Sequence, residues 1–429
     1  MLANFASVFS LMLSTLLMMV AFGLQSYVIP VRSVAEDWST LTVSVFATGY
    51  TLGFTLSCVV TPKFVLRVGH VRVFTALMTL LSIAILMCGL IVDWRAWIGF
   101  RAVSGFAIAG SYLVIESWLN ERVTNENRGL LFSLYLITTM IGTIAGQYLV
   151  PLGDPTNTSL FILCGVLFSL ALLPTALSSS PMPAAPTQAN FDLPGLFRRS
   201  PVAVVGGFLA GALSGAWLNL GGVFTQKIGL STSEGATLLA AVLAGSALSQ
   251  IPIGRASDRM DRRIVMIACG LFGVVSCLVT ALAIGSGAWI LYGLSGCVGM
   301  VLFPIYALNV AHANDLAQPD EYVKISSGLM ITYGLGTISG PLVVGPVMDA
   351  FGPAALFVML AVYFALYAGY AAWRIGQREQ YEGLVAKTDF QATTVLPTPG
   401  PDVTNPLAQQ ETGAMIEDDT VPEWEAQAQ

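Results

Sequence analysis

Charged residues are scarce in this chain. They make up 10% of its 429 residues, whereas hydrophobic residues make up 55%. A soluble globular domain carries about 25% charged residues, so this chain has too little charge to cover a surface that faces water. The composition argues against an ordinary soluble protein and favours one that lies mostly within a membrane.

The sequence also lacks the usual patterns of metal, disulfide and nucleotide sites. Its two histidines, His70 and His312, fall in predicted loops or span ends, and none of its six cysteines forms a CxxC pair. It has no Gly-x-x-x-x-Gly-Lys-Ser/Thr motif, which argues against direct use of ATP. We therefore expect no cofactor and no metal. An enzyme within the membrane is disfavoured, because clustered His, Cys and acidic residues are missing.

Long apolar runs are abundant instead. About 20 apolar residues cross a bilayer as a helix. Residues 1–31 contain no Lys or Arg, which fits a membrane span and not a cleaved signal peptide. Twelve runs predict an all-α membrane protein, and they cover approximately residues 5–29, 41–62, 73–92, 97–119, 129–150, 159–177, 202–225, 235–254, 264–284, 288–311, 325–345 and 354–373.

Basic residues are distributed unevenly over the loops. With a cytoplasmic N-terminus, fifteen of the 19 basic residues fall in cytoplasmic segments. The opposite loops hold only Arg32, Arg95 and Lys227, and Arg101 lies within the fourth run. Because Lys and Arg gather on the cytoplasmic side, we expect a multi-pass protein of the cell inner (plasma) membrane with both termini in the cytoplasm.

A five-residue pattern is repeated in two of the runs. Gly142-Thr-Ile-Ala-Gly146 returns as Gly336-Thr-Ile-Ser-Gly340, just under half the chain length later. Such repeats are typical of transporters built from two duplicated halves. We predict two pseudo-symmetric six-helix halves, residues 1–177 and 201–375. A flexible cytoplasmic linker is expected over 178–200, and a disordered acidic cytoplasmic tail over 376–429.

The repeated glycines are four residues apart, a spacing that lets two helices approach closely. Gly142, Gly146, Gly336 and Gly340 are therefore predicted helix-packing positions. Pro341 is grouped with them because it is expected to bend its helix. Two interpretations stay open, namely static packing and a flexing element of a transport cycle.

The loop after the eighth run, residues 254–263, reads Gly-Arg-Ala-Ser-Asp-Arg-Met-Asp-Arg-Arg. It resembles the Gly-x-x-x-Asp-Arg-x-Gly-Arg-Arg signature of the major facilitator superfamily (MFS), with Asp261 in place of a glycine. The first-half loop has Leu66 where the family has Asp. The resemblance implies a loop that latches a cytoplasmic gate; the alternative is that its basic residues only anchor loops at the membrane surface. The implied gate positions are Gly254, Asp258, Arg259, Arg262, Arg263, Arg67 and Gly69.

The fourth and fifth runs strengthen the resemblance. Arg101-x-x-x-Gly105 matches a family pattern, and the stretches 116–129 and 142–147 are similar to the bacterial YcaD-like branch. The resemblance covers about residues 5–375, and it implies the MFS fold of twelve helices and a functional monomer. Part of the neighbourhood of that branch is associated with vitamin uptake, including flavin.

Two ionisable residues within the fourth run are candidates for function, because a charge inside a membrane usually faces a partner or a cavity. Arg101 and Glu116 are about 22 Å apart along a helix, on one face. Arg101 could bind an anionic solute or pack structurally. Glu116 could carry a coupling proton or hold a cationic solute group, or it could pair with Arg67 or Arg128. Asp349 is expected in an outer loop, which leaves Glu116 as the best proton carrier.

Other polar and aromatic residues could line a solute cavity. In the superfamily, spans one, four, seven and ten line that cavity, so we favour candidates from these spans. Packing or anchoring at the membrane interface is the alternative for each aromatic residue. The predicted substrate-cavity set is Gln25, Arg101, Tyr112, Glu116, Trp217, Asn219 and Tyr306.

These patterns predict a secondary active transporter, not an enzyme, that moves a small organic solute by alternating access. The leading interpretation is proton-coupled symport of a nutrient or vitamin, with a flavin-like aromatic solute as the narrowest guess. Efflux of drugs or metabolites by proton antiport is the alternative, and a transporter-derived sensor is a minor one. The expected partners are the solute, protons and the lipid bilayer, with no nucleic acid.

Overall fold

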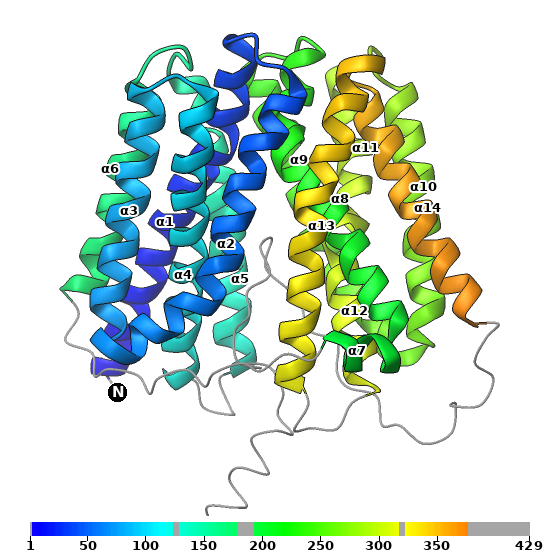
Figure 1. Cartoon of the computed structure of the whole chain (residues 1–429), viewed down its shortest axis with the longest axis horizontal. Coiled ribbons are helices and arrows are strands. Elements are labelled where there is room, and N and C mark those ends of the chain that lie inside the picture. Colours follow the sequence, from blue (N-terminus) through cyan, green and yellow to red (C-terminus); the bar gives the residue numbers. More distant parts are fainter. Residues whose placement is uncertain (1, 123–127, 178–192, 317–321, 376–429) are drawn as a thin grey trace, which may run out of the picture.

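All regular secondary structure in the described residues is helical (Figure 1). The computed structural model describes residues 2–122, 128–177, 193–316 and 322–375. Its elements are α1 (Leu2–Ala35), α2 (Thr40–Val68), α3 (His70–Leu90), α4 (Trp94–Arg122), α5 (Arg128–Gln147), the 3-10 turn η1 (Val150–Leu152), α6 (Ser159–Ala176), α7 (Leu193–Arg199), α8 (Pro201–Lys227), α9 (Thr232–Arg259), α10 (Arg262–Leu282), α11 (Ala288–Leu302), α12 (Pro304–Asn314), α13 (Tyr322–Phe351) and α14 (Ala355–Ile375).

Twelve spans in the described ranges are long and apolar enough to cross a membrane, as the sequence predicts. The tenth span consists of α11 and α12, which are separated at Phe303. Pro304 explains the break, because proline lacks a backbone N–H and its ring clashes with the preceding turn. Large apolar side chains such as Leu248, Leu282 and Trp289 are exposed. Their exposure is expected of a surface that contacts lipid.

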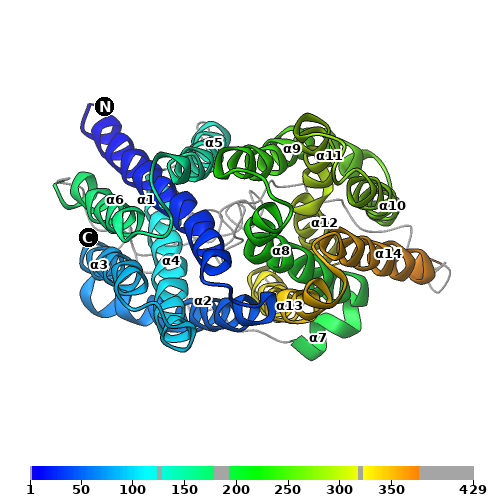
Figure 2. The same cartoon turned by 90° about the horizontal axis from the view of Figure 1, so that it is seen from above.

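The helices form two halves of the same design, α1–α6 and α8–α14, which lie side by side in Figure 2. In the first half α1 packs on α5, α2 on α4, and α3 on α6. The corresponding pairs of the second half are α8 with α13, α9 with α11, and α10 with α14. This repeated pairing agrees with the two pseudo-symmetric six-helix halves expected from the sequence.

The repeated glycines lie at equivalent helix crossings. A Cβ atom at Gly146 of α5 would overlap the backbone of Val20 in α1. A Cβ atom at Gly340 of α13 would overlap the backbone of Ala212 in α8 in the same way. Gly142 and Gly336 face the same partners one turn earlier, against Met19 of α1 and Phe208 of α8 respectively. The repeat therefore marks close helix approaches at equivalent places in the two halves.

Part of the expected linker is helical. Residues 193–199 form α7, whose Leu196 is buried against Ala203 of α8 and against Ile325 and Leu329 of α13. Leu196, which lies between the two halves in sequence, therefore packs against the second half. The rest of the expected linker, 178–192, and the tail, 376–429, lie outside the described residues.

The two halves meet along α2 and α13, α1 and α8, and α5 and α9. We call the end of the bundle that carries Asp349 the Asp349 face, and the opposite end the Arg262 face. The chain's N-terminus lies at the Arg262 face, at the bottom of Figure 1. Every helix that crosses the bundle therefore has one end at each face, and contacts between the halves can be assigned to one or the other.

Candidate transport path

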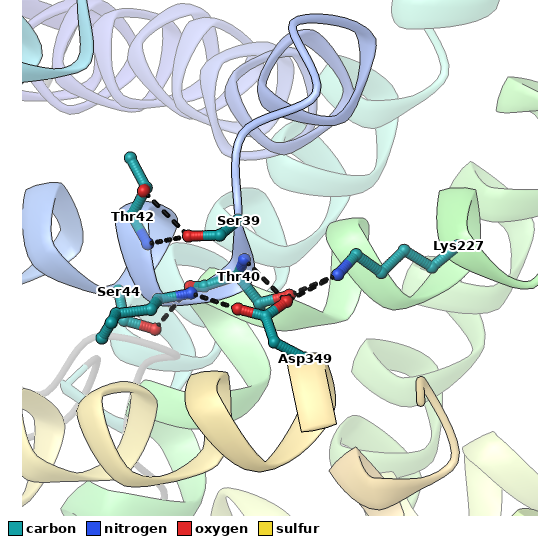
Figure 3. Close-up of polar contacts among 7 residues, drawn as sticks. Ser39, Thr40, Thr42, Ser44, Lys227 and Asp349 are labelled. Atoms are coloured by element: carbon teal, nitrogen blue, oxygen red, sulfur yellow. Dashed lines mark hydrogen bonds and ion pairs between the residues drawn. The ribbon is translucent and has the colours of Figure 1, made fainter. Parts of the chain in front are cut away.

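A polar cluster joins the two halves at the Asp349 face (Figure 3). Asp349, in the last turn of α13, accepts hydrogen bonds from the backbone amides of Thr40 and Leu41 at the start of α2, both at 3.0 Å. The Thr40 hydroxyl donates to the same carboxylate at 2.5 Å. Lys227 Nζ, at the end of α8, lies 2.9 Å from Asp349 Oδ1 and 2.6 Å from Thr40 Oγ1. One carboxylate thus holds α2, α8 and α13 together.

The start of α2 is prepared for this carboxylate by its own sequence. Ser39 caps the helix by accepting a hydrogen bond from the amide of Thr42 at 3.1 Å. The amides of Thr40 and Leu41 have no partner within the helix, because the first turn of any helix leaves its N–H groups free. A carboxylate is favoured at this positive end of the helix, and Asp349 provides it from the other half.

The position of Asp349 corrects the sequence-based expectation. The apolar pattern ends span eleven near residue 345 and puts Asp349 in a loop, whereas α13 continues to Phe351. A membrane helix commonly extends past its apolar run, because its last turn lies at headgroup depth where polar groups are tolerated. The sequence did carry one signal for this contact. Asp349 lies just beyond the eleventh apolar run, and Lys227 lies just beyond the seventh.

Further hydrogen bonds between the halves lie toward the same face. The Tyr27 hydroxyl of α1 donates to the backbone carbonyl of Thr232 at 3.0 Å. It also accepts a hydrogen bond from the Gln226 amide of α8 at 3.2 Å. The Tyr148 hydroxyl, just after α5, lies 3.0 Å from Thr237 Oγ1 of α9. All three pairs of facing helices are therefore tied at this end.

The deepest of these ties is at Ser44 of α2, which donates to the backbone carbonyl of Pro341 in α13 at 2.7 Å. Each described hydrogen bond between the halves lies at this depth or nearer to the Asp349 face. In Figure 1, α2 leans away from α13 toward the Arg262 face. The bundle is thus closed by polar contacts at one end, and these contacts stop part-way through.

The loop between α9 and α10 is organised by Arg262, whose side chain is buried. Its guanidinium contacts the Asp315 carboxylate twice, at 2.6 and 3.1 Å, just after α12. It also donates to Ser257 Oγ at 2.7 Å and lies 3.4 Å from Asp258 Oδ1, both in α9. Arg262 therefore ties the ends of α9, α10 and α12 together at the Arg262 face.

The structure explains why aspartate can stand at position 261, where the family signature has glycine. Its side chain caps α10 by accepting a hydrogen bond from the Arg263 amide at 2.9 Å, and it pairs with the Arg263 guanidinium at 3.1 Å. Burial raises the pKa of Asp261, but the hydrogen bonds and charge of Arg263 lower it by more, so the pKa lies below its ordinary value. The cap therefore stays charged at neutral pH. In the same motif Gly254 is buried and Arg259 is exposed.

The corresponding loop of the first half is shorter than expected. Residues 63–68 were predicted as loop, but they extend α2 to Val68. Gly69 alone separates α2 from α3, with a φ of 86° that favours glycine. His70 begins α3 and lies 3.0 Å from Ser117 Oγ of α4. Arg67 is exposed and makes no ion pair with Glu116, so that predicted pairing is not formed in this structure.

The two ionisable residues of α4 lie in different surroundings. Arg101 is 7% exposed, and its guanidinium carbon lies 4.4 Å from the ring centre of Tyr50 in α2. Glu116 is also 7% exposed and accepts a hydrogen bond from the Tyr135 hydroxyl of α5 at 3.2 Å. Tyr112, predicted beside Glu116, is buried and donates to the Met19 sulfur of α1 at 2.9 Å. The side chain of Arg128 lies outside the described residues.

The remaining cavity candidates do not form one cluster. Gln25 of α1 is buried, and its Oε1 has no hydrogen-bond partner. Trp217 packs against Phe357 of α14, and the Asn219 amide donates to the backbone of its own helix at 2.8 Å. Tyr306 of α12 stacks edge-on with Tyr333 of α13, with ring centres 4.7 Å apart. Tyr50, Tyr135 and Tyr333, which the favoured set left out, are thus direct partners of its members.

Comparison with known families decides the assignment. The model of the family described as Major Facilitator Superfamily matches residues 11–231 and 202–400, which is most of this chain. The chain belongs to the major facilitator superfamily. Solved structures of MFS-type transporters agree with this fold. The nucleoside transporter NupG superposes with a TM-score of 0.72 at 15% identity, over 86% of this chain and 98% of NupG.

A second solved structure is a bacterial homolog of the human lysosomal transporter Spinster in an inward-facing, unoccupied conformation. It superposes with a TM-score of 0.71 at 14% identity, over 88% of this chain and 99% of that one. Sequence relatives include an uncharacterized MFS-type transporter of Yersinia pestis, 27% identical over 82% of this chain and 91% of its own length. The MFS-type transporter YcaD of Escherichia fergusonii is 26% identical over 83% of this chain and 93% of its own. The resemblance to the YcaD-like branch is thereby confirmed.

Proposed function

We propose that this MFS member is a secondary transporter that moves a small organic solute across the inner membrane by alternating access. The observation that carries the proposal is the one-sided distribution of hydrogen bonds between the halves, which gather toward the Asp349 face. Two similar halves tied at one end can rock about a site near the membrane midplane. This structure then represents the state that is closed at the Asp349 face.

We assign the Arg262 face to the cytoplasm. Basic residues favour the cytoplasmic side of a membrane protein, and the adjoining ends of α9 and α10 at this face carry Arg255, Arg259, Arg262 and Arg263. The ends of helices at the Asp349 face carry few basic residues, among them Arg32, Arg95 and Lys227. In this orientation the closed Asp349 face is the outer one, and both termini are cytoplasmic.

Uptake of a nutrient or vitamin is the direction we favour, with a flavin-like aromatic solute as the first candidate. The helix α1 contains no acidic residue, and Glu36 follows its outer end, whereas many multidrug exporters of the superfamily carry an acidic residue within this span. The aromatic pair Tyr306 and Tyr333 suits a flat organic solute bound by stacking. Proton-coupled efflux of drugs or metabolites is the competing direction.

Glu116 is the proposed coupling residue. It is buried within the span Trp94–Leu119, where an ionised carboxylate is costly and where taking up a proton removes that cost. Tyr135 holds the carboxylate from α5, and α5 also faces α9 of the other half. A change in protonation at Glu116 can therefore reach a helix that lies between the halves.

The proposal is tested with the purified full-length protein in two steps. Thermal unfolding is first measured with vitamins, aromatic metabolites, organic acids and common drugs, because a ligand of the folded state raises its stability. Each stabilising compound is then offered in labelled form to proteoliposomes, with protein-free liposomes as the control. Accumulation of a nutrient or vitamin under an imposed proton gradient is expected. Hits restricted to unrelated drugs would favour efflux, and no flux of any stabilising compound would contradict a transporter.

A further inference from the structure

Arg101 is a buried cation that forms no hydrogen bond with any residue that the structure describes. It lies seven residues into α4, within the span Trp94–Leu119. Its Nε and Nη1 atoms are fully buried and form no hydrogen bond, so at least three N–H donors are unsatisfied. A buried charge left unpaired costs several kcal/mol. Something other than the described side chains must therefore satisfy this guanidinium, or the protein must tolerate a large penalty.

No acid takes that role among the described residues. The described ion pairs do not include Arg101, so no described carboxylate is paired with its guanidinium. Tyr50 meets the flat face of the guanidinium, at 4.4 Å from the ring centre. Stacking uses that face and leaves the in-plane N–H donors available.

The fold holds Arg101 and Tyr50 together firmly. One turn after Arg101, a Cβ atom at Gly105 would overlap the backbone of Tyr50 itself. One turn after Tyr50, Gly53 lies equally close to the backbone of Ala102. These contacts bring α2 and α4 to their closest approach beside the stacked pair. The Arg-x-x-x-Gly spacing therefore fixes the position of the guanidinium against the ring of Tyr50.

Tyr50 offers a second donor at the same place. Its hydroxyl is buried and has no hydrogen-bond partner among the described residues, and an unsatisfied buried hydroxyl also costs free energy. A guanidinium edge and a phenol hydroxyl are the donors that recognise carboxylate or phosphate oxygens. A neutral or cationic group would leave the Arg101 charge unpaired.

We propose that Arg101 and Tyr50 form the subsite that binds an anionic group, a carboxylate or a phosphate, of the transported solute. This inference rests on the proposed transport function and narrows the solute to an organic anion. The guanidinium binds the anionic oxygens through its free N–H donors, and the Tyr50 hydroxyl donates one further hydrogen bond. Release of the anion leaves both groups unsatisfied, as in this structure.

The test compares charged probes with neutral analogues. Binding of benzoate and phenyl phosphate to the purified full-length protein is measured by thermal shift and calorimetry, beside benzamide and benzyl alcohol. A saturable shift with at least one anion and none with its neutral analogue is expected. Arg101→Gln should weaken that binding at least about 30-fold, because one partner of a buried charge pair is removed. Tyr50→Phe should weaken it about fivefold through the loss of one hydrogen bond.

Arg95→Gln is the matched control, because Arg95 also stacks on an aromatic ring of α4, Trp94 at 5.2 Å, but is exposed. It should bind the anion with wild-type affinity. Equal stabilisation by benzoate and benzamide, or wild-type affinity in both Arg101→Gln and Tyr50→Phe, would overturn the subsite. Transport of neutral solutes alone would contradict the anion subsite but not the proposed transport function. Absence of any solute flux would contradict the transport function itself.

Discussion

The carboxylate of Asp349 accepts hydrogen bonds from both the backbone amide and the hydroxyl of Thr40, at 3.0 and 2.5 Å, although 309 positions separate the two residues in sequence. Asp349 belongs to the second half and Thr40 to the first. The contact uses the positive end of α2, so it requires that helix to lie against α13. Any state that opens the Asp349 face must break it.

Asp349→Asn is therefore expected to favour opening at that face. The asparagine loses the charge that attracts Lys227 and the helix end, and charge-assisted hydrogen bonds contribute about 1.5–3 kcal/mol when well buried. Since the Asp349 side chain is 26% exposed, we expect a shift of roughly tenfold in the open population. The open population is measured as the rate at which a membrane-impermeant maleimide alkylates Thr237→Cys.

The control for this measurement is Asp154→Asn. Asp154 lies near the same face, but its carboxylate bonds only to Thr156 and Asn157 of its own loop. It should leave the alkylation rate of Thr237→Cys unchanged. Equal rates in the Asp349→Asn and wild-type backgrounds would show that the cluster does not hold the face closed.

Arg262→Gln should destabilise the folded protein. Its guanidinium is buried and joins α9, α10 and the residue after α12, so its loss removes both of its contacts with the Asp315 carboxylate. Breaking a buried pair in this way costs about 3 kcal/mol. Thermal unfolding in detergent measures the loss, with the exposed Arg259→Gln as the control. A midpoint equal to that of Arg259→Gln would refute the role given to Arg262.

Asp261→Ala should cost about 1 kcal/mol through the lost cap of α10, and Asp261→Gly, which restores the family residue, only a few tenths. Because the folded-state pKa of Asp261 is lowered, its contribution is present above the unfolded pKa of about 3.9 and is lost as the pH falls through the folded value. The difference in midpoint between wild type and Asp261→Ala should thus shrink below about pH 4. A difference that does not change with pH would contradict a charged cap.

Gly146→Ala should destabilise the first half by about 1–3 kcal/mol, because the added methyl group overlaps the backbone of α1. Gly369→Ala in α14 is the matched control, since nothing lies within 4 Å of its Cβ position. The control should be neutral or slightly stabilising, because alanine is the better helix former. Similar midpoints for the two variants would show that the α1–α5 contact is looser than described.

Glu116→Gln separates the coupling role from a structural one. If Glu116 carries the proton, the variant should lose concentrative uptake but keep exchange of solute across the proteoliposome membrane. Tyr135→Phe removes the hydrogen bond at 3.2 Å that links the carboxylate to α5 and keeps the carboxylate itself, so it should weaken concentrative uptake but less than Glu116→Gln does. Equal loss of uptake and exchange in a folded Glu116→Gln protein would assign Glu116 a structural role.

Much of the fold follows from the sequence, because hydropathy alone locates membrane spans and the glycine repeat reveals the duplication. The Arg-x-x-x-Gly spacing also has a local cause, the approach of α4 to α2 at Gly105. The ends of the helices were harder to predict from the sequence, because polar terminal turns extend α2 to Val68 and α13 to Phe351, beyond their apolar runs.

The closure at the Asp349 face could not be predicted from one sequence. Asp349, Thr40 and Lys227 each look like ordinary end-of-span residues, and only the packing of the two halves brings them together. Partners within the membrane were missed for the same reason. Tyr50 and Tyr135 contact Arg101 and Glu116 from neighbouring helices, and no periodicity within α4 points to them.

The most direct test of alternating access is a pair of distances measured by double electron–electron resonance in lipid vesicles. Spin labels are placed on Leu41→Cys and Phe351→Cys at the Asp349 face, and separately on Leu66→Cys and Arg255→Cys at the Arg262 face, in protein freed of its native cysteines. The account predicts that Asp349→Asn lengthens the first distance and shortens the second together. If the two distances stay fixed, or change in the same direction, the halves do not alternate and the central claim is wrong.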